Sequence, residues 1–150
     1  MKPAYLVSAC LAGESCRYDG SSCKNEWVAA LILRGEAVGF CPEIEGGLGV
    51  PRERCELCEE PGGATRVISA SGRDVTEYFL RGARKAVELV VKHGIGAAVL
   101  KSRSPSCGFG RIYDGSFSGR LVDGMGVTAR LLREMGVCLY TEGDVPALLT

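Results

Sequence analysis

The sequence predicts an α/β protein: a three-layer, Rossmann-like sandwich with a mostly parallel central sheet, in a single domain over residues 1–150. Two observations support this class. Short apolar runs of four or five residues alternate with longer segments that have helical periodicity. The composition, 46% hydrophobic and 24% charged, is that of an ordinary globular chain, and 150 residues are enough to bury a core. Because parallel strands need crossover connections, their carboxyl ends meet at one edge of the sheet, where we expect the site.

The first half of the chain supplies two strands, a helix and a hairpin. A strand is predicted over 5–9, followed by a Gly-rich polar loop over 11–20. The helix is predicted over 25–34 and ends at Gly35, with an apolar face made of Trp27, Val28, Leu31 and Ile32. The second strand is 37–40. Residues 46–52 are predicted as a loop. Residues 55–63 carry charges, turn residues and a Cys-x-x-Cys, and 66–69 are predicted as a short strand in a hairpin at the sheet edge.

The second half contains the most strongly amphipathic segment. This helix is predicted to start near Asp74, where Asp74 and Glu77 have capping-box spacing, and to end at Gly94. A buried strand follows over 97–100, and 112–115 forms an extended piece and a turn. The chain is predicted to close with a helix over 127–134, a strand over 137–140 and a short helix from Asp144.

Charge and hydropathy limit the partners and the location of the protein. Lys+Arg and Asp+Glu both number 18, and this balance argues against a nucleic acid as the main partner. No apolar run approaches the ~18 residues of a membrane span. The apolar stretch before Cys10 is shorter than the roughly 7–15 residues of a secretion signal, so we expect a cytoplasmic protein. In the reducing cytoplasm, eight cysteines suggest metal, cluster or nucleophile chemistry rather than disulfides.

Three of these cysteines follow predicted strands. Cys10, Cys41 and Cys107 come directly after an apolar strand, or one loop later, and should therefore meet at one sheet edge. Each could instead be a small core residue. A structural zinc site needs four Cys or His ligands. The one histidine, His93, ends the long helix on the opposite side, where it suits the helix dipole. Soft thiolates favour an iron–sulfur cluster, and three ligands on four irons would leave one iron open as a Lewis acid.

The other cysteines have weaker patterns. Cys16 could be a spare ligand, a nucleophile or a bystander; a phosphatase-type Cys-x5-Arg loop fails by one residue, since six residues separate Cys10 from Arg17. Cys55-x-x-Cys58 alone is a weak zinc or redox signal. We assign Cys23 and Cys138 to packing.

Polar residues accompany the three strand-end cysteines. Glu43 stands two residues after Cys41, and Lys101, Ser104 and Ser106 precede Cys107. A carboxylate beside a metal site can act as a general acid or base, and Lys101 could stabilise developing negative charge. For each residue a loop hydrogen bond is the alternative role. Residues 124–129 fit the dinucleotide pattern Gly-x-Gly-x-x-Ala, but they do not directly follow a predicted strand, which argues against that use.

Motifs in fixed order over nearly the whole chain resemble the thiouracil desulfidase family. They are Val7-Ser8-Ala9-Cys10-Leu11, Cys16-Arg17-Tyr18-Asp19-Gly20, Cys41-Pro42-Glu43 with Gly46-Gly47-Leu48 and Pro51-Arg52, Asp74-Val75-Thr76, Lys101, and Ser104-Pro105-Ser106-Cys107-Gly108 with Ile112-Tyr113-Asp114-Gly115. The resemblance implies a [4Fe-4S] enzyme with cluster ligands Cys10, Cys41 and Cys107 and one open iron. It also implies non-redox removal of sulfur from a small thiolated nucleobase or nucleoside. Glu43 would activate water or shuttle a proton, and Ser104 would position the substrate. The Cys55/Cys58 pair departs from the family pattern.

The sequence is also compatible with two other functions. The protein could carry sulfur or a cluster, or sense through a cluster, without turnover. It could also be a binding module in which Cys55 and Cys58 hold zinc.

Overall fold

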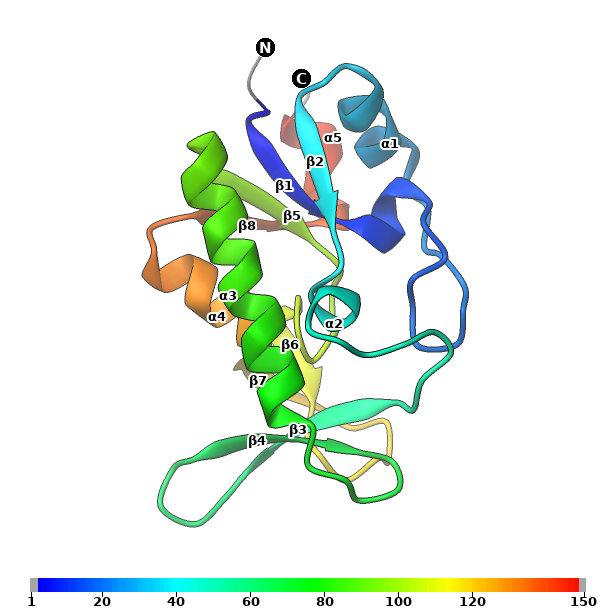
Figure 1. Cartoon of the computed structure of the whole chain (residues 1–150), viewed down its shortest axis with the longest axis vertical. Coiled ribbons are helices and arrows are strands. Elements are labelled where there is room, and N and C mark those ends of the chain that lie inside the picture. The colour runs from blue at the N-terminus through cyan, green and yellow to red at the C-terminus, as the bar shows by residue number, and fades with distance from the viewer. Residues whose placement is uncertain (1–2, 149–150) are drawn as a thin grey trace.

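The computed structural model describes residues 3–148 and is built around a four-stranded sheet with the strand order β2-β1-β5-β8. The strands are β1 (Tyr5–Ser8), β2 (Ala37–Phe40), β5 (Ala97–Leu100) and β8 (Cys138–Thr141). Every neighbouring pair is parallel. The predicted parallel sheet is therefore confirmed, and the ends of β2, β1 and β5 lie next to one another at its carboxyl edge (Figure 1).

Helices cover both faces of this sheet, as the sandwich prediction requires. Successive strand residues point to opposite faces. On one face, Leu6 and Leu100 pack with α3 (Thr76–His93) and α4 (Val127–Glu134). On the other, Val7 and Val99 pack with α1 (Glu26–Leu33) and α5 (Val145–Leu148). No helix within residues 3–148 is long and apolar enough to cross a membrane.

Two antiparallel hairpins stand apart from the main sheet. They are β3 (Cys55–Glu59) with β4 (Thr65–Ser69), and β6 (Phe109–Tyr113) with β7 (Leu121–Met125). Both lie near the N-terminal end of α3 (Figure 1), over a third apolar cluster that includes Leu57, Val67, Phe79 and Ile112. The strand predicted over 66–69 does lie in a hairpin, but the prediction that this hairpin lies at the edge of the main sheet is wrong. Four of the five residues of β3 are glutamate or cysteine and one is leucine, so this strand forms through packing rather than through strand propensity.

Local capping explains the smaller differences from prediction. β1 ends at Ser8, and Ala9–Ala12 form the 3₁₀ helix η1, so Cys10 lies on a helical turn. Asp74 makes no capping box: its carboxylate accepts hydrogen bonds from the backbone N–H and the hydroxyl of Thr76, at 3.0 and 2.5 Å. At the C-terminus, the 3₁₀ turn η2 (Glu142–Asp144) precedes α5. Cys138 is exposed, so its assignment to packing is wrong.

The short helix α2 (Pro42–Glu45) is held against α3 through two glycines. A β-carbon on Gly82 of α3 would lie 1.9 Å from the carbonyl oxygen of Pro42, and one on Gly46 would lie 2.0 Å from that of Tyr78. Only glycine permits such a close backbone approach. This contact fixes where α2, and with it Glu43, sits relative to the sheet.

Candidate functional site

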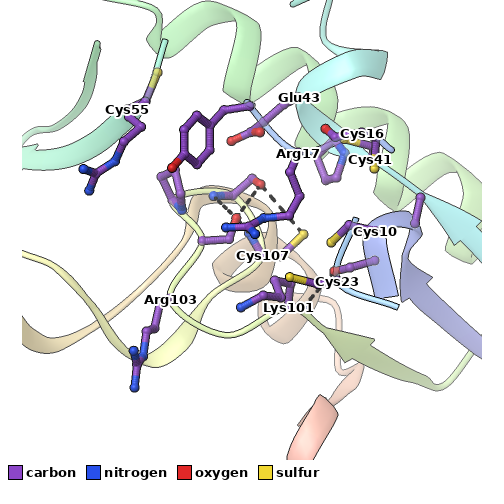
Figure 2. A pocket seen from close by; sticks show the side chains of 18 of the residues that line it. Cys10, Cys16, Arg17, Cys23, Cys41, Glu43, Cys55, Lys101, Arg103 and Cys107 are labelled. Atoms are coloured by element: carbon purple, nitrogen blue, oxygen red, sulfur yellow. Dashed lines mark hydrogen bonds between the residues drawn. The ribbon is translucent and has the colours of Figure 1, made fainter. Parts of the chain in front are cut away.

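A pocket with a volume of about 330 Å³ opens at the carboxyl edge of the sheet, as predicted. Its wall includes all six residues singled out from the sequence, which are Cys10, Cys41, Glu43, Lys101, Ser104 and Cys107. Figure 2 shows the three thiol groups around one region of the pocket, with Glu43 and Lys101 on different sides of it. The fold therefore brings together residues that are up to 97 positions apart in sequence (10 to 107).

Each of the three cysteines follows a different strand of the sheet. Cys10 lies on η1 after β1, and Cys41 caps α2 after β2. Cys107 lies in the loop after β5, where the Ser104 hydroxyl oxygen accepts hydrogen bonds from the backbone N–H groups of Ser106 and Cys107, at 3.1 and 3.0 Å. Cys10 and Cys107 are 8% and 4% exposed, so their thiols are nearly enclosed by protein.

Cys16 lies beside two of these thiols. Its thiol hydrogen-bonds with those of Cys10 and Cys41, and its carbonyl oxygen lies 3.8 Å from the Cys41 sulfur. The hydrogen bond with Cys10, together with burial, raises the pKa of Cys16 to about 11. The hydrogen bond with Cys16, followed by burial, raises the pKa of Cys41, and burial raises that of Cys107 to about 12. The protein alone therefore keeps the thiols of Cys16, Cys41 and Cys107 neutral, and a bound cationic group would be needed to favour their thiolates.

The Glu43 carboxylate is paired with Arg52. The guanidinium Nη2 and Nε of Arg52 both donate to Oε2 of Glu43, the latter at 3.1 Å. The two side chains are 14% and 8% exposed, respectively. Arg52 was not among the predicted site residues, and its only sequence signal is its place after Pro51 in the family motif.

Lys101 and Ser104 make the loop hydrogen bonds that were the alternative to a chemical role. The Lys101 ammonium donates to the carbonyl oxygen of Ser102 at 3.1 Å and lies 3.4 Å from a carboxylate oxygen of Glu142. The hydroxyls of Ser104 and Ser106 share a hydrogen bond of 3.0 Å, and the Ser106 hydroxyl in turn donates to the Cys107 sulfur at 3.8 Å. Lys101 and Ser104 both line the pocket, so these hydrogen bonds also fix the positions of the Lys101 ammonium and the Ser104 hydroxyl within it.

The side chains of Cys55 and Cys58 lie on opposite faces of β3. Residues three apart on a strand point to opposite faces. Cys55 lines the pocket, whereas the Cys58 thiol contacts the carbonyl oxygen of Gly115 at 3.7 Å. All eight cysteines are free thiols. Within residues 3–148, no three Cys, His, Asp or Glu side chains are arranged to hold a single metal ion. The geometry thus argues against a zinc site built on this pair.

Basic and aromatic side chains form the remaining rim; none was predicted as a site residue, although Arg17, Tyr18 and Tyr113 lie within the family motifs. The guanidinium of Arg17 lies 5.8 Å from the ring centre of Tyr18, and that of Arg54 lies 5.8 Å from that of Tyr113. All four residues, together with Arg103, line the pocket. Such a rim suits a planar, electron-rich ligand. Cys23, assigned to packing, does pack against the core and also lines the pocket.

Comparison with known proteins identifies the family of the chain. A family model described as 2-thiouracil desulfurase matches residues 5–144. The chain belongs to the 2-thiouracil desulfurase family. The resemblance drawn from the sequence motifs is thereby confirmed. A protein of Bacillus subtilis (strain 168), YbbK, whose function is uncharacterized, is 41% identical over 149 residues, which are 96% of this chain and 99% of that protein.

A solved structure extends the family likeness to the fold. It is described as the [4Fe-4S]-dependent thiouracil desulfidase TudS (DUF523Vcz). It shares 44% sequence identity and superposes with a TM-score of 0.88, over 99% of this chain and 96% of that one. The two chains therefore share the whole architecture.

Proposed function

We propose that the protein is a [4Fe-4S]-dependent desulfidase that removes sulfur from a thiolated pyrimidine, such as 2-thiouracil, or from a related thioamide. The reaction would convert the thiocarbonyl and water to the oxo base and sulfide, with no net electron transfer. The observation that carries the proposal is the meeting of three strand-end thiols and one carboxylate in a single pocket. Family membership and the likeness to TudS support it.

The donor set fits an iron–sulfur cluster. Cys10, Cys41 and Cys107 would hold it, because soft thiolates suit iron–sulfur centres and a four-iron cluster binds its ligands at different iron atoms. They need not converge on one point, which agrees with the lack of a single-ion site in the described part of the chain. With three protein ligands, the cluster would supply one open iron as a Lewis acid for the thiocarbonyl sulfur.

The chain's own residues then have distinct roles. Both Arg52 hydrogen bonds go to Oε2 of Glu43, which leaves Oε1 to take a proton from the attacking water and pass it on. Ser104 shapes the Cys107 loop; because its hydroxyl oxygen already accepts two backbone hydrogen bonds, its O–H would turn from Ser106 to donate to the substrate. The Lys101 ammonium, held by Glu142, would stabilise negative charge on the departing sulfur. The pocket is of a size for a nucleobase or nucleoside, and its aromatic rim would stack against the ring.

Anaerobic reconstitution followed by metal analysis tests the proposal. We expect about four iron and four sulfide per chain, release of sulfide from 2-thiouracil, and formation of uracil. Cys41→Ala should lose the cluster, whereas Cys138→Ala, at an exposed cysteine outside the pocket, should keep it. A colourless wild-type protein with fewer than about three irons after reconstitution would contradict the proposal.

One observation favours a second candidate, a cluster carrier or sensor without turnover. The Cys16 thiol contacts those of Cys10 and Cys41, so a fourth thiolate is available to complete a ligand set. A fully ligated cluster has no open iron for substrate. Sulfide release separates the two candidates: many equivalents per chain support the desulfidase, and an iron-loaded protein that releases no sulfide from 2-thiouracil supports the carrier or sensor.

A further inference from the structure

We infer that Arg52 is the positioning residue of the pocket: its guanidinium holds the Glu43 carboxylate in one orientation and fastens it to the loop that carries Cys16. The inference rests on the proposed function, since it assigns Glu43 the proton transfer. Arg52 acts through Glu43 and need not touch the substrate.

The contacts of Arg52 join segments that are distant in sequence. Besides its two hydrogen bonds to Glu43, Nη2 donates to the carbonyl oxygen of Cys16 at 3.0 Å. Nη1 donates to the carbonyl oxygen of Gly49 at 3.2 Å. The backbone N–H of Arg52 donates to the carbonyl oxygen of Tyr18 at 2.7 Å. One side chain thus spans the first loop, the start of α2 and its own loop. The planar guanidinium fork can make these bonds at once, which a lysine ammonium cannot.

Burial makes these contacts rigid and costly to lose. The Arg52 side chain is 8% exposed, and that of Glu43 is 14% exposed. Removal of the cation would leave the carboxylate without a counter-ion in a poorly hydrated place. The carboxylate would then turn towards water or move with α2. Because the Cys16 carbonyl oxygen also lies against the Cys41 thiol, the same guanidinium steadies the loop beside two proposed cluster ligands.

A double-mutant cycle tests whether Arg52 acts through Glu43. We expect Arg52→Met to lower kcat about a hundredfold with KM changed less than about threefold and iron content unchanged, because a misplaced general base slows the chemical step. In an E43Q background, the same replacement should lower kcat by less than about threefold further. Arg52→Lys should be intermediate, and free guanidinium should partly restore Arg52→Met. Arg34→Met is the matched control, because Arg34 makes a 2.9 Å ion pair with Glu36 through its Nε and is not among the residues that line the pocket.

The inference would be overturned if the losses of kcat in the two single variants multiplied in the double variant. It would also be overturned if Arg52→Met kept the wild-type kcat. If Arg52→Met does not fold, the double variant E43Q/R52M still decides, since it leaves no buried unpaired charge. Its kcat should equal that of E43Q within about threefold.

A second measurement uses the cluster-free protein and does not depend on turnover. The rate at which a maleimide labels Cys16, followed by peptide mass spectrometry, should rise about tenfold or more in Arg52→Met, because the loop loses its hydrogen bond to the guanidinium. Arg34→Met should label like the wild type. An unchanged Cys16 rate in Arg52→Met would overturn the fastening of this loop. Failure of the proposed function appears separately, as an iron-loaded wild-type protein that releases no sulfide.

Discussion

The contact between α2 and α3 predicts a large effect for a single methyl group. In Gly82→Ala, the new β-carbon would lie 1.9 Å from the carbonyl oxygen of Pro42, which is 1.5 Å closer than the 3.4 Å where ordinary contact begins. The obstacle is backbone rather than a flexible side chain, so α2 must move. Overpacking of this kind costs about 1–3 kcal/mol, and we expect the upper end of that range. Ala also improves helix propensity by up to ~1 kcal/mol, which leaves a net loss of about 2 kcal/mol.

Two assays measure this prediction. Thermal unfolding of the cluster-free protein, followed by circular dichroism, should show a Tm about 4–8 °C lower, at roughly 2–4 °C per kcal/mol for a chain of this size. Sulfide release by the loaded protein should fall about a hundredfold, because Glu43 adjoins Pro42 and moves with it by about an ångström.

Gly96 is the matched control, since a β-carbon there would meet nothing within 4 Å and its φ lies outside the left-handed region. Gly96→Ala should be neutral or up to ~1 kcal/mol more stable. A Gly82→Ala protein that melts within about 2 °C of the wild type would refute the close-approach reasoning.

Three further predictions concern the hairpins and the start of α3. Burial, above all, raises the pKa of Cys55 from 9.0 to about 11. The rate at which iodoacetamide alkylates Cys55 should therefore keep rising up to about pH 11, whereas the rate for a free thiol in solution levels off near pH 9. Because that folded-state pKa is raised, its contribution to stability should be lost between about pH 9 and 11, and Cys55→Ala should lack this loss. Glu56 is 2% exposed and accepts hydrogen bonds from two backbone N–H groups of the 115–117 turn. Glu56→Ala should lower the free energy of unfolding, measured in urea, by about 2–4 kcal/mol. A loss below about 0.5 kcal/mol would contradict this. Hydrogen bonds from Thr76 lower the pKa of Asp74 below 3.8, so part of the stability should disappear as the pH falls through that region, and Asp74→Asn should show a shallower acid dependence.

The sequence by itself determined the sheet and the meeting of the three cysteines. Hydrophobic periodicity is a local property, and it placed 37–40, 97–100 and 127–134 with the bounds that the structure has. Parallel topology then brings the residues that follow each strand to one edge, so the convergence of Cys10, Cys41 and Cys107 needed no knowledge of side-chain contacts.

Tertiary structure alone decided the electrostatics of the pocket. The pairing of Glu43 with Arg52 and the contact of Cys16 with Cys41 are non-local, and no periodic pattern encodes them. Likewise, β3 is a strand because Leu57 and Glu56 are buried there, a packing effect that outweighs weak strand propensity. Local patterns specify which backbone elements form, whereas partners for buried charges are set only when those elements pack.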